Sequence, residues 1–285
     1  MSDSPHPTGT LFIVATPIGN LGDMTSRAIE TLKTVDLIAA EDTRHSARLL
    51  QHFGIQTRMT SYHDFSDDSR VELLLRTLGE GKSVALISDA GTPLISDPGY
   101  RLVSRAREMQ IRVVPIPGVC AVTAALCAAG VPSDRFAFEG FAPARHSARL
   151  KLFQSLQSEV RTLVFYESPH RILECMDDMA AGFGPERIAV VARELTKTFE
   201  TIHCDSLGRL QQWLRADENQ QRGEFVVLLK GADSVPEEEV PAEARRILAV
   251  LMEELSVKQA AALASRLTGV KKNLLYSLAL ERTAD

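Results

Sequence analysis

The loop with the clearest capacity for ligand chemistry is Ser88-Asp89-Ala90-Gly91-Thr92-Pro93-Leu94-Ile95-Ser96-Asp97-Pro98-Gly99. It follows Ser83–Ile87, a short apolar segment typical of a buried parallel strand. Glycine lets a backbone approach a ligand closely or take positive φ, and proline stiffens the loop. The alternative is a simple turn in which Asp97 caps a helix over Tyr100–Met109. The loop is long for a connection, which favours a ligand.

Three further polar motifs follow apolar segments and carry groups that could move a proton or bind a phosphate. They are Glu41-Asp42-Thr43-Arg44-His45, Glu167-Ser168-Pro169-His170-Arg171 and Arg193-Glu194-Leu195-Thr196-Lys197. A general base placed there would typically contribute about 10²–10⁴-fold in rate. The candidate bases are Glu41, Asp42, His63, Glu167, Glu194 and Lys197. Each could equally position a ligand or form a structural ion pair.

Apolar segments alternate with helical patterns throughout the first part of the chain. The expected strands are Gly9–Ala15, Val35–Ala40, Thr57–Tyr62, Ser83–Ile87 and Ile111–Ile116. Such alternation is typical of a parallel sheet flanked by helices, and these sheets bind ligands at the carboxyl ends of their strands. We therefore predict a five-stranded α/β domain over residues 9–117. Its loops at Pro17–Asp23, Asp89–Gly99 and Pro117-Gly118 would then lie at one edge.

The second half predicts another α/β domain, over residues 118–232. A small-residue helix, Val119–Ala129, permits close approach by a ligand or simply packs on the sheet. The expected strands are Arg135–Phe141, Thr162–Tyr166, Arg187–Ala192, Glu200–His203 and Glu224–Leu229, with hairpin-like pairing toward the end.

A linker at Pro236–Pro241 precedes an all-helical tail over residues 240–285. Helices over Val257–Arg266 and Lys271–Leu280 flank a short turn with Gly269, which is helix-turn-helix spacing. From Ser256 onward the tail has five Lys or Arg against two Asp or Glu. This charge allows an RNA-contacting role, and equally a helical pair that packs on the body or on a second subunit.

Composition narrows the class of protein. The chain is 45% hydrophobic and 24% charged, as soluble globular proteins are. A net charge of −5 gives no global basic field for nucleic acid, so RNA contacts must come from local patches. The four cysteines show no CxxC spacing, which indicates reduced thiols in a cytoplasmic protein and no metal site. We expect neither a signal peptide nor a membrane span.

Six motifs in order resemble the tetrapyrrole methylases. They are Thr-Pro-Ile-Gly-Asn-Leu-Gly-Asp, Ala-Glu-Asp-Thr-Arg, Ser-Asp-Ala-Gly-Thr-Pro-Leu-Ile-Ser-Asp-Pro-Gly, Pro-Ile-Pro-Gly, Phe-Tyr-Glu-Ser-Pro-His-Arg and Ala-Arg-Glu-Leu-Thr-Lys. More narrowly, they resemble the branch that methylates the ribose 2′-oxygen of a cytidine in the decoding centre of 16S rRNA, using S-adenosylmethionine. The resemblance covers Gly9–Gly231 and extends to the tail; Val119-Cys120 departs from the usual Pro or Ser after Gly118.

This resemblance implies two α/β domains with the cofactor in the cleft between them, a 30S ribosomal subunit as partner, and a homodimer. The cofactor-binding positions that it implies are Pro17, Asp89, Gly91, Thr92, Ile95, Ala121, Val122, Thr123, Tyr166, Glu167, Leu195, Gly223 and Glu224. We expect phosphate contacts from Arg44, His45, Arg145, Arg149, Arg171, Arg193, Lys271 and Lys272. Solvated surface arginine is the alternative for Arg145 and Arg149.

For the chemistry we predict that Glu167 receives the hydroxyl proton near the sulfonium and that Lys197 stabilises the developing alkoxide. Glu167 and Lys197 could instead pair to hold the strand ends together. Glu41, Asp42 and Glu194 are further candidates for a catalytic role.

Two other functions remain open from the sequence. A carbon-methylating tetrapyrrole enzyme would also use an arginine-lined cleft, because its substrate is a polycarboxylate. A non-catalytic RNA-binding assembly factor could hold S-adenosylmethionine structurally. The basic tail and the Glu41–His45 motif favour an RNA substrate.

Overall fold

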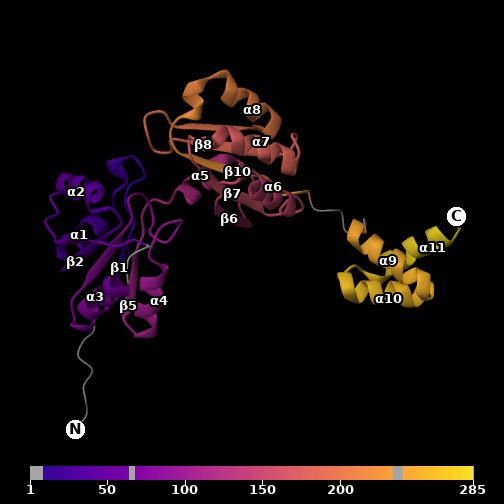
Figure 1. Ribbon diagram of the computed structural model, residues 1–285, viewed down its shortest axis with the longest axis horizontal. Helices are drawn as coiled ribbons and strands as arrows, with labels where there is room; N and C mark the ends of the chain where they lie inside the picture. The colour runs from indigo at the N-terminus through magenta and orange to yellow at the C-terminus, as the bar shows by residue number, and fades with distance from the viewer. Residues whose placement is uncertain (1–8, 64–67, 234–239, 285) are drawn as a thin grey trace, which may run out of the picture. The chain divides into compact units, whose positions relative to one another are not determined.

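The computed structural model describes residues 9–63, 68–233 and 240–284. The chain divides into two compact units, Met1–Ala232 and Asp233–Asp285 (Figure 1). The first unit contains two five-stranded sheets and the second is helical. The N-terminal residues 1–8 and most of the linker expected at Pro236–Pro241 lie outside the described residues.

The first sheet is parallel throughout, with strand order β3-β2-β4-β1-β5. Its strands are β1 (Thr10–Val14), β2 (Leu37–Ala40), β3 (Met59–Ser61), β4 (Val84–Ile87) and β5 (Arg112–Ile116). The helices are α1 (Ser26–Thr34), α2 (Thr43–His52), α3 (Asp68–Gly79) and α4 (Tyr100–Glu108), with a short 3-10 turn η1 (Leu21–Asp23). One apolar core joins the sheet to α3 and α4, and another joins its opposite face to α1 and α2. Because both faces are covered, β4 is buried along its whole length.

The second sheet is mixed, with order β6-β7-β10-β8-β9. Its strands are β6 (Phe136–Phe141), β7 (Thr162–Glu167), β8 (Ile188–Arg193), β9 (Thr201–Ser206) and β10 (Phe225–Leu229). β6 and β7 are parallel, whereas β10 runs antiparallel to both of its neighbours and β8 pairs antiparallel with β9. Helix α5 (Ala121–Ala129) packs on one face. The other face carries α6 (His146–Ser155), α7 (Ile172–Phe183) and α8 (Leu207–Ala216), with η2 (Glu218–Gln221) after α8.

Helix ends follow local capping chemistry. The Thr25 hydroxyl accepts a hydrogen bond from the backbone N–H of Ala28, which fixes the start of α1. The alternative in which Asp97 caps α4 is contradicted by the structure. The cap position is Gly99, which has φ of 139° and no side-chain hydrogen bond. Asp97 instead lines a pocket.

The tail has three helices, α9 (Ala242–Glu254), α10 (Val257–Thr268) and α11 (Lys272–Ala284). Gly269 is left-handed with φ of 74° and ends α10, as its place in the sequence predicts. Small residues such as Ala260 and Ala264 pack with Leu248 and Leu275 into a core that belongs to this unit. The predicted α/β fold with a helical tail is confirmed. No helix in the described ranges has the length and apolarity needed to cross a membrane.

Candidate active site

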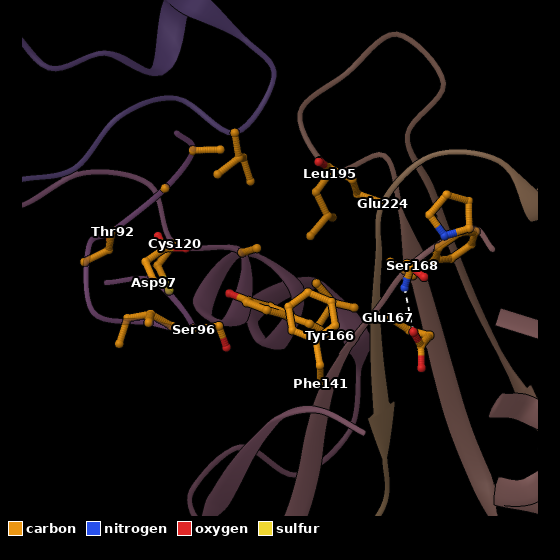
Figure 2. Close-up of a pocket in the computed structure, with 18 residues that line it drawn as sticks. Thr92, Ser96, Asp97, Cys120, Phe141, Tyr166, Glu167, Ser168, Leu195 and Glu224 are labelled. Atoms are coloured by element: carbon orange, nitrogen blue, oxygen red, sulfur yellow. Dashed lines mark hydrogen bonds between the residues drawn. The ribbon is translucent and has the colours of Figure 1, made fainter. Parts of the chain in front are cut away.

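A cavity of about 360 Å³ lies within the first unit and is lined from both sheets (Figure 2). Its walls come from the loops after β1 and β4, the start of α5, the ends of β6 and β7, the loop after β8 and the start of β10. The predicted cofactor residues that line it are Gly91, Thr92, Ile95, Ala121, Tyr166, Glu167, Leu195 and Glu224. The remaining predicted cofactor residues do not line the cavity: Pro17, Asp89, Val122, Thr123 and Gly223.

Backbone hydrogen bonds join the loop after β4 to the loop after β1. Thr16 and Gly91 exchange two of them, with N···O distances of 2.8 and 3.0 Å. Gly91 has φ of 85°, a conformation that side chains rarely adopt. The Thr92 hydroxyl donates to the backbone oxygen of Val119 at 2.9 Å, which ties the same loop to the start of α5. The three glycine and proline loops therefore do meet at the carboxyl edge of the first sheet.

Several non-glycine residues beside the cavity hold left-handed backbone conformations. Leu94 and Ser96 have φ of 74° and 63°, and Glu194 and Thr196 have φ of 52° and 66°. Each such residue costs on the order of 1–3 kcal/mol and persists only where the surroundings fix it. Both strained segments border the same cavity, so strain of this kind indicates a functional site there.

Tyr166 forms an apolar wall of the cavity. Its ring makes edge contacts with Phe138 and Phe141 at centroid distances of 4.9 and 5.7 Å. Burial, with the neighbouring Cys120, raises the pKa of its hydroxyl. The phenol therefore stays neutral and can donate a hydrogen bond.

Glu167 borders the cavity, but its carboxylate is turned to the other face of the sheet. Arg171 donates to Oε2 at 2.9 Å. The backbone N–H of Ser168 donates to Oε1 at 2.7 Å (Figure 2). The side chain is fully buried, and burial together with the Glu167 carboxylate raises the pKa of Cys175 in α7. The predicted role of Glu167 as proton acceptor is wrong, because its side chain is enclosed and already paired.

Lys197 pairs with two carboxylates on the cavity side, not with Glu167. Its Nζ lies 2.7 Å from Glu194 Oε1 and 2.9 Å from Glu224 Oε2. Burial alone would lower the pKa of Lys197, but the hydrogen bonds that it donates to both carboxylates raise it overall. Burial would raise the pKa of Glu194, yet Lys197 and the Glu224 N–H lower it overall. Lys197 and Glu194 are therefore ionised at neutral pH.

Two glycines leave room for this charged cluster. A Cβ at Gly223, which has φ of 95°, would overlap the side chain of Glu194. A Cβ at Gly19, in the loop after β1, would overlap the stem of Lys197. The cluster thus connects the loops of the two sheets. Gly223 affects it indirectly, because only a residue without a side chain leaves space for Glu194.

Lys197 and Glu194 do not themselves line the cavity, and neither do the remaining predicted bases. Asp42 caps α2, and the N–H groups of Arg44 and His45 lower its pKa. The backbone N–H of Asp42 donates to Asp89 Oδ1 at 3.0 Å, so Asp89 connects this motif to the loop after β4. Glu41 and His63 do not line the cavity.

Three of the arginines predicted to contact phosphate are structural. Arg149 is 1% exposed and its Nε donates to Asp178 Oδ2 at 2.6 Å. Arg193 is also buried and donates to two backbone oxygens, and Arg171 is held by Glu167 and the Ala142 oxygen. The prediction of a surface role for Arg149 is wrong, because α6 turns it inward to α7. The exposed basic residues that remain are Arg44, His45, Arg145, Lys271 and Lys272.

Sequence reasoning did not single out Ile18, Ser96, Cys120 or Phe141, all of which line the cavity. Ile18 and Ser96 belong to the glycine and proline loops after two predicted strands, so their position in those loops indicated that they could line a site. For Phe141 the only signal is Gly140, a glycine inside a strand.

The residues fit a small organic cofactor of mixed polarity. Apolar side chains such as Ile95 and Leu195 can cover a flat ring, while the backbone near Gly91 is open to close approach. Glu224 and Asp97 add carboxylates that favour a cationic group. The volume lies in the range of small-molecule sites. Among the residues that the structure describes, no group of three His, Cys, Asp or Glu could hold a metal ion.

Both parts of the chain match known protein families, and proteins similar to the whole chain are known. The family model of Tetrapyrrole (Corrin/Porphyrin) Methylases matches residues 10–211, and that of the RsmI C-terminal HTH domain matches residues 238–283. The chain is similar to the Ribosomal RNA small subunit methyltransferase I of Escherichia coli O157:H7, with 55% identity over 96% of both chains. It is also similar to the protein of that name from Pseudomonas aeruginosa, with 57% identity over 96% of this chain and 98% of the relative.

A solved structure of diphthine synthase matches with a TM-score of 0.59, covering 78% of this chain and 90% of that one. Its 16% identity shows a shared fold alone.

Proposed function

The chain belongs to the tetrapyrrole methylases, within them to the ribosomal RNA small subunit methyltransferase I family, and on that premise we propose that it methylates a ribose. The methyl group would pass from S-adenosylmethionine to the 2′-oxygen of a cytidine in the decoding centre of 16S rRNA. The observation that carries the proposal is identity above 50% to named relatives over nearly the whole chain. The cavity between the loops of the two sheets is the proposed cofactor site.

The bound cofactor supplies a methyl group on a sulfonium, which is an excellent leaving group. The ribose hydroxyl is a weak nucleophile that must lose its proton, to solvent water, as it attacks, and negative charge develops on its oxygen as that proton leaves. Lys197, held protonated between Glu194 and Glu224, cannot accept a proton but can stabilise that developing charge. Orientation of the two reactants supplies about 7–11 kcal/mol of the barrier. Positioning therefore contributes more than any single base.

The exposed basic residues are the proposed phosphate contacts. Arg44, His45 and Arg145 follow the strands of the first unit, and Lys271 and Lys272 open α11 in the tail. Phosphate contacts of this kind position RNA and make binding salt-dependent. The homodimer implied by the family resemblance stays a prediction, which sedimentation equilibrium of the full chain tests.

The test is transfer of labelled methyl from S-adenosylmethionine to small ribosomal subunits purified from cells that lack the enzyme. We expect one methyl per subunit, recovered as 2′-O-methylcytidine after digestion of the 16S rRNA. Label in a base rather than a ribose would contradict the proposed reaction. Label only in a tetrapyrrole substrate would replace it with carbon methylation. Cofactor binding without transfer to either would leave a non-catalytic assembly factor.

A Lys197→Met variant examines the proposed role of the lysine in that assay. It keeps most of the stem beside Gly19 but removes the charge. Loss of an electrostatic contact of this kind typically costs roughly 10²–10³-fold in rate. We expect the single-turnover rate to fall by that amount, with a smaller change in cofactor affinity. A rate within threefold of the unaltered protein would return Lys197 to a purely structural role.

A further inference from the structure

Strand β6 changes register against β7 just before it reaches the cavity. Phe138 pairs with Val164, whereas Phe141, three residues on, pairs with Tyr166. One residue of β6 is therefore extra, and Gly140 takes a left-handed φ of 66° at this bulge. Side chains alternate between the faces of a strand, so a one-residue shift moves each later side chain to the opposite face.

The bulge decides where Phe141 points. Regular pairing would set it opposite Glu167, whose side chain is enclosed on the face covered by α7. The shift places it instead beside Tyr166, with the two rings inclined at 65° (Figure 2). Phe141 thus lines the cavity because of a backbone irregularity, and bulges of this kind re-aim side chains beside active sites.

The Phe141 side chain is more exposed to solvent than the other large apolar side chains of the cavity. It is 55% exposed, while the other large apolar side chains of the cavity, such as Ile95 and Leu195, are half-buried or buried. A phenylalanine turned away from the apolar core and left at the cavity mouth offers a free aromatic face. The exposed Arg145 follows it immediately before α6, where its guanidinium can meet a phosphate.

We propose that Phe141 stacks on the base of the nucleotide whose ribose is methylated. This inference rests on the proposed function and adds the group that recognises the substrate. A nucleotide that enters a pocket must leave the base stack of its RNA, and an aromatic side chain can replace its lost stacking partner. Stacking needs only a π face, so it holds the base without reading its hydrogen-bonding edge. Phe141 is a positioning residue, because it does not touch the reacting oxygen.

Three substitutions separate stacking from packing. Phe141→Leu keeps an apolar side chain without a π face, Phe141→Ala removes most of the side chain, and Phe141→Trp keeps the π face. We expect Leu and Ala to lower kcat/KM for unmethylated small subunits by about 5- to 150-fold, the range measured for base–aromatic stacking. The kcat/KM of the Phe141→Trp variant should stay within about threefold of that of the unaltered protein. S-adenosylmethionine affinity, measured by calorimetry without RNA, should change less than threefold in all three.

A second substrate tests which base is held. Small subunits are reconstituted with 16S rRNA that carries an abasic ribose at the methylated position. The unaltered protein should lose activity on this substrate, and Phe141→Leu should lose nothing further. A Leu variant as active as the unaltered protein on normal subunits would overturn the proposal. So would an equal loss by the Leu variant on abasic subunits, since that would place the ring against another nucleotide.

A parallel loss of cofactor affinity would also overturn it, by assigning Phe141 to the cofactor. Failure of the proposed function is distinguishable from all of these, because the unaltered protein would then methylate no ribose.

Discussion

Replacing Gly91 by valine should weaken cofactor binding by an amount that the structure allows to be estimated. Gly91 has φ of 85°, and left-handed backbone costs a side chain about 1–2 kcal/mol. A Cβ there would lie 3.3 Å from Ile18 Cγ2, which is tight, and the valine methyls would press further on Ile18 in the cavity wall. Overpacking of this kind costs about 1–3 kcal/mol. If that cost falls on the wall of the site, affinity for S-adenosylmethionine should drop by about 5- to 150-fold.

Gly54→Val is the matched control. Gly54 has φ of 63°, but a Cβ there would meet nothing within 4 Å. Gly54→Val should lose about 2–8 °C in melting temperature, because its backbone strain of about 1–2 kcal/mol shifts a chain of this size by about 2–4 °C for each kcal/mol. Gly91→Val should lose more, because the overpacking against Ile18 adds to the same strain. Only Gly91→Val should bind the cofactor more weakly by calorimetry. Equal affinities in the two variants would refute the placement of the site against this loop.

Three further outcomes are expected. Asp178→Asn should destabilise the protein by about 3–5 kcal/mol in urea unfolding, because it removes the buried charge that faces Arg149 at 2.6 Å and leaves only the more distant Glu174, at 3.6 Å. The adjacent Asp177→Asn, which breaks the exposed pair with Arg215, should cost about 1 kcal/mol or less, and similar costs for the two variants would contradict the burial argument. Hydrogen bonds from Arg161 lower the pKa of Glu159 from its ordinary 4.5 to about 2. The contribution of Glu159 to stability is therefore present above pH 4.5 and is lost as the pH falls toward 2. An NMR titration of Glu159 should show a midpoint at about pH 2, and Arg161→Ala should return that midpoint toward 4.5. A chain ending at Ala232 should keep its cofactor affinity but methylate small subunits poorly, and full activity of that truncation would show that the tail does not serve RNA binding.

The first sheet was predictable because its signal is local. Parallel strands covered on both faces appear in the sequence as short apolar runs, and Val84–Ile87 is such a run, buried at all four positions. Each run is followed within two residues by a proline or an acidic residue, so the loops that meet at the cavity could be identified from the sequence. In the second sheet the predicted strand ends agree with the structure within one residue, except that β9 continues to Ser206, three residues beyond the predicted His203. Their order was not predicted, because β10 enters between β7 and β8 through pairings remote in sequence.

Glu167 shows why a correct strand can still give a wrong side-chain role. The segment Thr162–Tyr166 is apolar or large on both faces, so it carries no alternation that would tell which face residue 167 takes. The predicted phosphate contact of Arg149 was wrong for a related reason. Its partner Asp178 lies 29 residues away on another helix, and one charged residue in a helix gives no sign of such burial. Long-range pairing, and not local preference, decided both positions.

Lys197 does not line the cavity but pairs with Glu224, which does, and these partners narrow the chemistry open to it. If Lys197 paired with Glu167, it would form a structural ion pair on the face of the sheet that is covered by α7. Paired with Glu194 and Glu224, it is a cation held on the cavity side, with its stem packed over the loop after β1. Because both carboxylates raise its pKa, it enters any reaction at neutral pH as a charge and not as a base. Its charge can then act only where negative charge grows in the transition state, so it should affect the transfer rate more than the binding of either reactant.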